Sequence, residues 1–134
     1  MPVRSSWQQG VGPIVNRVLI ADDSPLMRRQ IRAILERDPD IRICAEAENG
    51  VEALQQVQRY RPDLVVLDLR MPVMNGLTAT REIKKVAPQV TVLVFTLYDS
   101  PQIEWESKRA GADALVPKTA ATNLLPKVIR SLLE

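Results

Sequence analysis

The 134-residue sequence contains no histidine, and this absence excludes several kinds of chemistry. Imidazole often acts as a general base near neutral pH, and it is a common metal ligand. A histidine-based catalytic site, a histidine-ligated metal and a phosphohistidine are therefore impossible within this chain. Any step that requires a histidine must use one that a partner supplies.

Cysteine is nearly absent as well. Cys44 is the single cysteine, so the chain cannot form an internal disulfide. A protein without disulfides suits a reducing compartment, and we expect a cytoplasmic location. Cys44 lies in an apolar stretch with the pattern of a strand, which favours an inert core thiol over a reactive one.

Long apolar runs and charge stripes are also missing. No uncharged apolar run approaches the roughly 20 residues of a membrane-spanning helix. The 18 basic and 16 acidic residues are interspersed, and the formal net charge is only +2. Without a basic stripe to follow a phosphate backbone, direct binding of nucleic acid is not expected. The sequence therefore predicts a soluble protein, and its length fits one domain.

What the sequence does contain is a regular alternation of strand and helix patterns. Residues 1–16 show no sustained periodicity and are interpreted as a flexible leader, and residues 17–134 as the folded domain. Short apolar runs predict five strands, at 17–21, 41–47, 64–67, 90–95 and 113–117. Helices are predicted at 25–37, after Gly50, between Gly76 and Pro88, between Pro101 and Gly111, and at 122–133.

The alternation predicts an α/β fold, a parallel sheet with right-handed crossovers and helices on both faces. Ser24-Pro25 and Ser100-Pro101 have the N-cap and first-turn proline of a helix start. Apolar stripes support the first three helices: Leu26, Ile31, Ile34 and Leu35 in the first, Val51, Leu54 and Val57 in the second, and Leu77, Ile83 and Val86 in the third.

Polar side chains follow the predicted strands. Asp22 and Asp23 follow the first, Asp68 the third, Thr96 the fourth and Lys118 the fifth. The carboxyl ends of parallel strands meet at one edge of a sheet, where such folds bind ligands. Three carboxylates repel each other unless a cation joins them, and an all-oxygen set favours Mg²⁺, with Mn²⁺ as an alternative.

This combination points to a phosphoryl acceptor. A carboxylate nucleophile beside a hard cation, a lysine and a hydroxyl has what phosphoryl transfer requires. The motif of Asp22-Asp23, Asp68-Leu69-Arg70-Met71-Pro72 with Gly76, Thr96 and Lys118 resembles the receiver domain of two-component response regulators. The resemblance extends from about Arg17 to the C-terminus. It implies a flavodoxin-like, doubly wound, five-stranded parallel sheet in the order 2-1-3-4-5.

The resemblance also implies a role for each matching residue. Asp68 would be the phosphoacceptor, Asp23 a direct Mg²⁺ ligand, Asp22 a ligand mostly through water, and the Arg70 backbone carbonyl another ligand. Thr96 would hydrogen-bond the phosphoryl group, and Lys118 would pair with it. The donor in this family is a phosphohistidine on a sensor histidine kinase or a histidine phosphotransfer protein, which agrees with the missing histidine.

The sequence departs from the usual receiver pattern beside the acceptor. Leu97 follows Thr96 where a small residue is common, and it would narrow the approach to Asp68. Arg70 and Tyr98 occupy positions that flank the phosphoryl group in the family. Their side chains either shield it from water and tune hydrolysis or point to solvent, and the sequence leaves both interpretations open.

Further departures affect signal transmission and subgroup. Leu115 replaces the aromatic residue that many receivers use as a readout, so the switch must be transmitted otherwise or weakly. Thr119 follows Lys118 where many receivers have proline, and Pro117 precedes it. This pattern is closest to receivers attached to LuxR-type DNA-binding domains, although no such domain is present. The sequence does not separate a stand-alone receiver from part of a longer protein.

Trp105 is a candidate docking residue. It lies off the inward stripe that Ile103, Ser107 and Ala110 define, on a face where receivers often contact partners or form homodimers. The alternative is that Trp105 covers the last helix.

Two other functions compete with a phosphorylation switch. One is a pseudo-receiver, a phosphorylation-independent protein-binding module, which Leu97 and Leu115 favour and the complete acidic pocket opposes. The other is a phosphatase of the haloacid dehalogenase type. That enzyme class has a second Asp two residues after its nucleophile, and Arg70 stands there instead, so we expect no enzyme beyond Mg²⁺-dependent self-phosphorylation and self-dephosphorylation.

Overall fold

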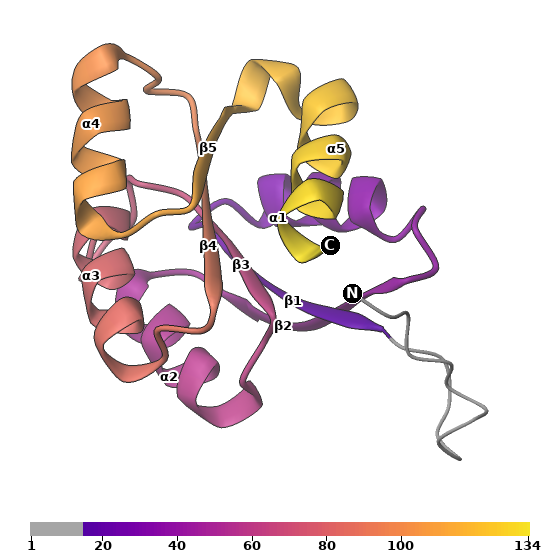
Figure 1. Ribbon diagram of the computed structural model, residues 1–134, viewed down its shortest axis with the longest axis horizontal. Coiled ribbons are helices and arrows are strands. Elements are labelled where there is room, and N and C mark those ends of the chain that lie inside the picture. Colours follow the sequence, from indigo (N-terminus) through magenta and orange to yellow (C-terminus); the bar gives the residue numbers. More distant parts are fainter. Residues whose placement is uncertain (1–14) are drawn as a thin grey trace.

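The computed structural model describes residues 15–134, and these form one parallel sheet between two layers of helices (Figure 1). The predicted leader lies outside the described residues except for Val15 and Asn16, and Asn16 already begins the first strand. The elements in chain order are β1 (Asn16–Ala21), α1 (Pro25–Leu35), β2 (Ile41–Ala47), α2 (Gly50–Tyr60), β3 (Leu64–Leu67), α3 (Gly76–Val86), β4 (Thr91–Thr96), α4 (Pro101–Ala110), β5 (Ala114–Pro117), a 3₁₀ turn (Lys118–Ala120) and α5 (Ala121–Leu133).

The sheet has the strand order β2-β1-β3-β4-β5, with every neighbouring pair parallel, as predicted. Helices α1 and α5 cover one face, and α2, α3 and α4 cover the other (Figure 1). All four residues of β3 are buried because they are covered on both faces. This doubly wound arrangement places the carboxyl ends of all five strands at one edge.

Apolar side chains alternate between the two faces along the central strands. On the α2 and α3 side, Leu19 and Val65 pack in one buried cluster with Ile83. On the α1 and α5 side, Ile20 and Val66 pack in another. The sheet is therefore held on both sides, which keeps its carboxyl edge in place.

Local signals start and end the helices where the sequence predicted. The hydroxyls of Ser24 and Ser100 accept hydrogen bonds from the main-chain N–H groups of Met27 and Ile103, each at 3.1 Å. Gly111 ends α4 in the left-handed region, with a φ of 109°. The predicted Ser-Pro helix starts and glycine C-cap are thus confirmed.

Several predicted helical details were wrong. Helix α1 ends at Leu35 rather than at residue 37, because the chain turns into the loop where the Asp38 N–H bonds the Leu35 carbonyl. Leu26 is 58% exposed, since Met27 rather than Leu26 shares the inward face with Ile31.

In α3, Val86 is 50% exposed because Ala87 takes the inward position one turn after Ile83. In the edge strand β2, Cys44 is half-buried rather than part of the core. Burial raises the pKa of its thiol, which agrees with the predicted lack of reactivity.

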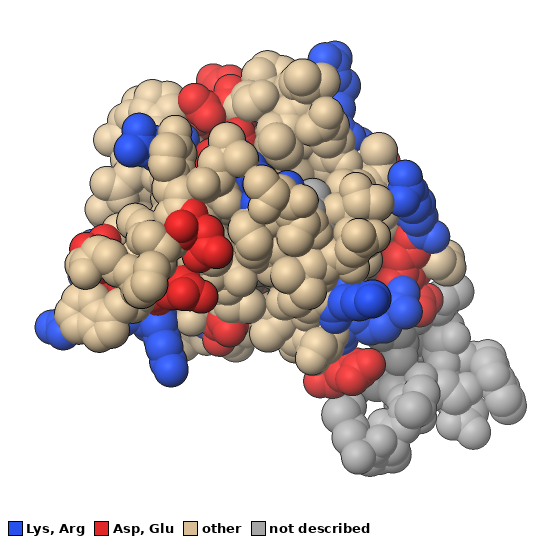
Figure 2. All heavy atoms as spheres, turned by 90° about the horizontal axis from the view of Figure 1, so that it is seen from above, with Lys and Arg blue, Asp and Glu red and all other residues tan. Residues whose placement is uncertain are grey.

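Basic and acidic side chains both occur on the face that Figure 2 shows. In the view onto the edge where β4 and β5 end, the described Lys and Arg side chains lie in separate small groups (Figure 2). Among the described residues, no helix is both long and apolar enough to cross a membrane.

Candidate functional site

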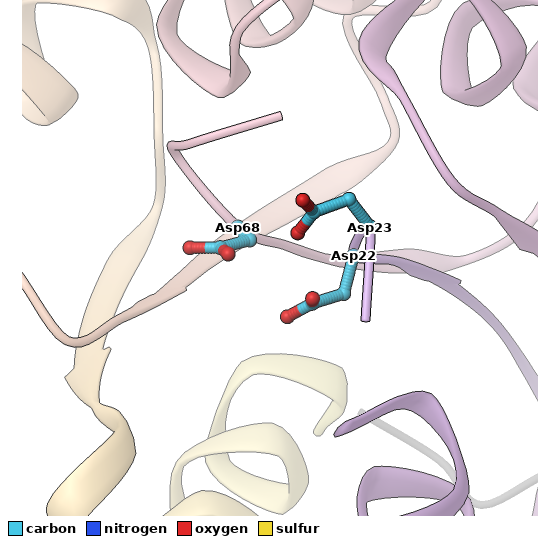
Figure 3. A group of neighbouring side chains, drawn as sticks. All are labelled: Asp22, Asp23 and Asp68. Atoms are coloured by element: carbon cyan, nitrogen blue, oxygen red, sulfur yellow. The ribbon is translucent and has the colours of Figure 1, made fainter. Parts of the chain in front are cut away.

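Three carboxylates meet at the carboxyl edge of the sheet. Asp22 and Asp23 follow β1, and Asp68 follows β3, with one carboxylate oxygen from each lying within 4.8 Å of the others. The side chains of Asp22 and Asp23 extend toward the side on which Asp68 lies (Figure 3). Asp22 and Asp68 are buried, at 1% and 6% exposure, whereas Asp23 is exposed.

Main-chain contacts hold this arrangement. The Asp68 N–H donates to the Ala21 carbonyl at 2.9 Å and so continues the β1–β3 pairing past the strand end. The N-terminus of α3 lies directly against Asp68, where a Cβ on Gly76 would collide with the Asp68 carbonyl. Only glycine allows this approach, which explains the Gly76 in the motif.

Lys118 lies between the two buried carboxylates. Its Nζ is 2.7 Å from Asp22 Oδ2 and 3.1 Å from Asp68 Oδ2, and all three side chains are at most 8% exposed. The other Asp68 oxygen, Oδ1, accepts a hydrogen bond from the Leu69 N–H at 2.8 Å. Asp68 is therefore held at both oxygens.

Burial and pairing act in opposite directions on these charges. Burial raises the pKa of Asp68, against the opposing attraction of Lys118. Burial alone would lower the pKa of Lys118, but the hydrogen bond to Asp22 and the charges of both carboxylates raise it overall. Lys118 therefore stays protonated, and it lies beside Asp68, a carboxylate whose ionised form is disfavoured by burial.

An open cavity of about 440 Å³ adjoins this cluster. Its lining comprises Asp22, Asp23, Ser24, Met27, Asp68, Arg70, Leu97, Tyr98 and Lys118. Thr96 is fully buried, and it is not among these lining residues; its Oγ1 accepts a hydrogen bond from the Tyr98 N–H at 3.0 Å. Asp68 therefore borders this cavity directly.

Comparison with known proteins decides the family. The family model for the response regulator receiver domain matches residues 18–130. The chain belongs to this family. The resemblance drawn from the paired aspartates, Asp68, Thr96 and Lys118 is thereby confirmed.

Individual relatives agree with this assignment. The chain is 38% identical over 107 residues to a protein-glutamate methylesterase/protein-glutamine glutaminase of Pyrococcus abyssi, covering 79% of this chain and 29% of that protein. It is 44% identical over 103 residues to such a protein of Myxococcus xanthus, covering 76% and 29%. The chain thus spans less than a third of these relatives.

Solved receiver structures have the same fold. The response regulator domain of Thermotoga maritima CheB has a TM-score of 0.79 at 29% identity, covering 88% of this chain and 96% of that one. A LuxR-family response regulator from Staphylococcus aureus has a TM-score of 0.84 at 27% identity, covering 90% and 100%. Both LuxR-type and CheB receivers are therefore structural neighbours.

The receiver places Arg70 and Tyr98 against each other at the cavity. The Arg70 guanidinium lies 3.9 Å from the centroid of the Tyr98 ring, a cation–π contact. Both residues are exposed, and both line the cavity, so they form one wall beside Asp68. Leu97 lines the same cavity and is 63% exposed.

Trp105 is not among the residues that line this cavity. It is 57% exposed on α4, with the Arg109 guanidinium 5.1 Å from its ring centroid. Of the predicted inward stripe of α4, Ser107 and Ala110 are buried, and Ile103 is half-buried. Docking through Trp105 stays a prediction.

Sequence reasoning missed two residues that hold the acidic turn. Ser24, predicted only as a helix cap, also donates its main-chain N–H to Asp22 Oδ1 at 2.9 Å. Arg28 donates to the Asp22 carbonyl. An aspartate two residues before a Ser-Pro helix start could have indicated the first contact, but no local pattern indicates the second.

The loop between β3 and α3 contains a strained residue. Val73 has a φ of 70° in a γ-turn, where the Met74 N–H donates to the Pro72 carbonyl at 2.7 Å. Because Val73 is 82% exposed, its side chain contributes little packing.

We expect Val73→Gly to raise the free energy of unfolding by about 1 kcal/mol in urea titrations, since glycine adopts positive φ without strain. Val73→Ala should raise the free energy of unfolding by less than Val73→Gly does. A lower free energy of unfolding for Val73→Gly would contradict the interpretation that Val73 is strained.

Proposed function

We propose that this receiver takes a phosphoryl group from a partner's phosphohistidine onto Asp68 and thereby switches its interactions. The observation that carries this proposal is the position of Asp68, a nearly buried carboxylate bordering an open cavity, with Lys118 3.1 Å away and two further carboxylates beside it. The phosphohistidine would come from a sensor histidine kinase or a histidine phosphotransfer protein.

The acidic cluster suits Mg²⁺, and Mn²⁺ would also fit. All three donors are carboxylates, and a single lysine does not balance their charge. Asp22 is the most deeply buried of the three carboxylates, at 1% exposure, which favours a water-mediated role for it. Asp23 is exposed and suited to direct ligation, with Asp68 and the Arg70 carbonyl completing the protein ligands. A bound Mg²⁺ would neutralise negative charge on the carboxylates and the phosphoryl oxygens.

In the transfer, an Asp68 oxygen attacks phosphorus as the nitrogen–phosphorus bond of the partner's phosphohistidine breaks. The imidazole leaves with the bonding electron pair, and Asp68 becomes an aspartyl phosphate. Lys118 would then pair with a phosphoryl oxygen. Thr96 would donate its hydroxyl proton, since its oxygen is the acceptor for Tyr98 and the donor function remains.

Intact mass spectrometry tests this function. The receiver is incubated with acetyl phosphate and Mg²⁺, or with a phosphorylated kinase, and a matched sample contains a chelator. A phosphoryl adduct that forms with Mg²⁺ and not with the chelator supports the switch. Absence of an adduct with every donor favours the alternative, a phosphorylation-independent binding module.

We further propose that the switched receiver acts in the cytoplasm, without contacting membrane or nucleic acid itself, and that its own chemistry is limited to Mg²⁺-dependent self-phosphorylation and self-dephosphorylation. Exposed Trp105 makes α4 a candidate face for a partner or for a homodimer. Sedimentation of the phosphorylated and unphosphorylated receiver distinguishes these two outcomes.

Leu97 is expected to slow phosphorylation by small donors. Its exposed side chain lines the cavity that leads to Asp68, so truncation should widen the approach. Leu97→Ala should therefore acquire the acetyl phosphate adduct several-fold faster than the wild type. Val86→Ala, which shortens an exposed apolar side chain of α3 outside the cavity lining, should react at the wild-type rate. Equal rates for Leu97→Ala and the wild type would remove Leu97 as a barrier.

A further inference from the structure

Arg28 connects α1 to the acidic turn. Its Nη1 donates to the main-chain carbonyl of Asp22 at 2.6 Å, and its Nε donates to Glu46 Oε1 at 3.0 Å. The Arg28 side chain is only 16% exposed. One guanidinium therefore bridges the end of β1 and the end of β2 without touching a carboxylate of the acidic cluster in these contacts.

Glu46 fixes the orientation of this guanidinium. Its second oxygen, Oε2, accepts hydrogen bonds from Nε and Nη2 of Arg32, one turn further along α1. A carboxylate held by two guanidiniums has little rotational freedom, because each charge-assisted hydrogen bond restricts it. Arg28 is thereby kept in the geometry that reaches the Asp22 carbonyl.

The bond to the Asp22 carbonyl restrains the peptide that joins Asp22 to Asp23. On its other side, the Asp22 N–H donates to the Ala47 carbonyl at 3.0 Å. With both main-chain groups of Asp22 bonded, the plane of the following peptide is set. The direction of the Asp23 side chain depends on that plane, since Asp23 is exposed and has little packing of its own.

We propose that Arg28, oriented by Glu46, is a positioning residue that aims the Asp22-Asp23 turn for binding a divalent cation. This inference rests on the proposed function, because it concerns the same acidic cluster. The positive charge of Arg28, taken alone, predicts the opposite effect on the affinity for the cation. A guanidinium near a cation site repels the cation, so its removal would tighten binding if Arg28 acted only through its charge. The sign of the effect therefore separates positioning from electrostatics.

Calorimetric titration of the full chain with Mg²⁺ measures this sign. Arg28→Met keeps most of the side-chain volume and removes both hydrogen bonds, and we expect it to weaken Mg²⁺ binding about tenfold, the lower range for loss of an outer-shell partner. Arg28→Lys should recover only part of the affinity, since one ammonium lacks the fork that reaches both acceptors. Arg29→Met removes an exposed guanidinium of the same helix that makes none of these contacts, and it should bind Mg²⁺ like the wild type.

Thermal unfolding in chelator accompanies each titration. A merely structural role would lower the melting temperature of Arg28→Met and leave the Mg²⁺ dissociation constant unchanged, and that result, or tighter binding, overturns the inference. If Arg28→Met does not fold, Arg28→Lys decides, because it keeps the positive charge: weaker Mg²⁺ binding supports positioning, and unchanged binding overturns it. Failure of the wild type itself to bind Mg²⁺ would instead refute the proposed function, and the inference with it.

Discussion

Asp68→Asn is expected to abolish the phosphoryl adduct that the wild type acquires with Mg²⁺ and a phosphodonor. An amide does not attack phosphorus under these conditions, and no other carboxylate within residues 15–134 has the same surroundings. Asp22 is more deeply buried than Asp68, at 1% against 6% exposure, and Asp23 is exposed. Intact mass measured over a time course should show the adduct on the wild type alone.

Asp99→Asn is the matched control for this experiment. It removes one exposed carboxylate from the loop between β4 and α4, near the site in sequence, and should leave the adduct unchanged. If Asp68→Asn acquired the adduct in the same yield as the wild type, another residue would be the acceptor, and the proposal would be contradicted.

Asp68→Asn should also unfold at a higher temperature than the wild type when both are measured in chelator at neutral pH. Burial raises the pKa of Asp68 above its ordinary value, so folding disfavours the ionised carboxylate. This cost is fully present above the folded-state pKa and disappears as the pH falls below the unfolded-state value. The stability difference between Asp68→Asn and the wild type should therefore shrink on acidification, which thermal scans across acidic pH would detect.

The fold was predictable because local and long-range signals agree. Each central strand is an apolar run between turn residues, and the alternation with helices leaves a parallel doubly wound sheet as the consistent arrangement. The errors came at positions where periodicity is ambiguous. Leu26 and Met27 are both apolar neighbours at the start of α1, and only packing against the sheet decides that Met27 turns inward.

The carboxylate cluster was predictable for a topological reason. Strand ends converge in a parallel sheet, so Asp22, Asp23 and Asp68 had to approach each other. The contacts that hold and flank the cluster were not predictable, because they join side chains to distant partners without periodic spacing. The bond from Arg28 to the Asp22 carbonyl and the stacking of Arg70 on Tyr98 depend on rotamers that only the assembled fold determines.

Lys118→Met is expected to destabilise the metal-free receiver by about 3–5 kcal/mol, the range for breaking a buried ion pair by removing one partner. The variant leaves the carboxylates of Asp22 and Asp68 buried without the ammonium that each now contacts. Urea unfolding in chelator measures the loss. Lys85→Met is the control, since its ion pair with Glu82 is exposed and should contribute well under about 1 kcal/mol.

Two conditions should relieve the loss in Lys118→Met, and both follow from charge. Repulsion from Asp22, which the ammonium no longer offsets, should raise the pKa of Asp68 further. The variant then takes up a proton at Asp68 on folding, so its stability should rise as the pH falls and its deficit in free energy of unfolding relative to the wild type should narrow. At neutral pH, Mg²⁺ should reduce the difference in free energy of unfolding between Lys118→Met and the wild type, because it replaces the missing positive charge. If Lys118→Met unfolds at the wild-type urea concentration in chelator, the lysine does not stabilise the buried carboxylates. If its stability deficit stays the same at every pH, lost packing rather than lost charge explains it.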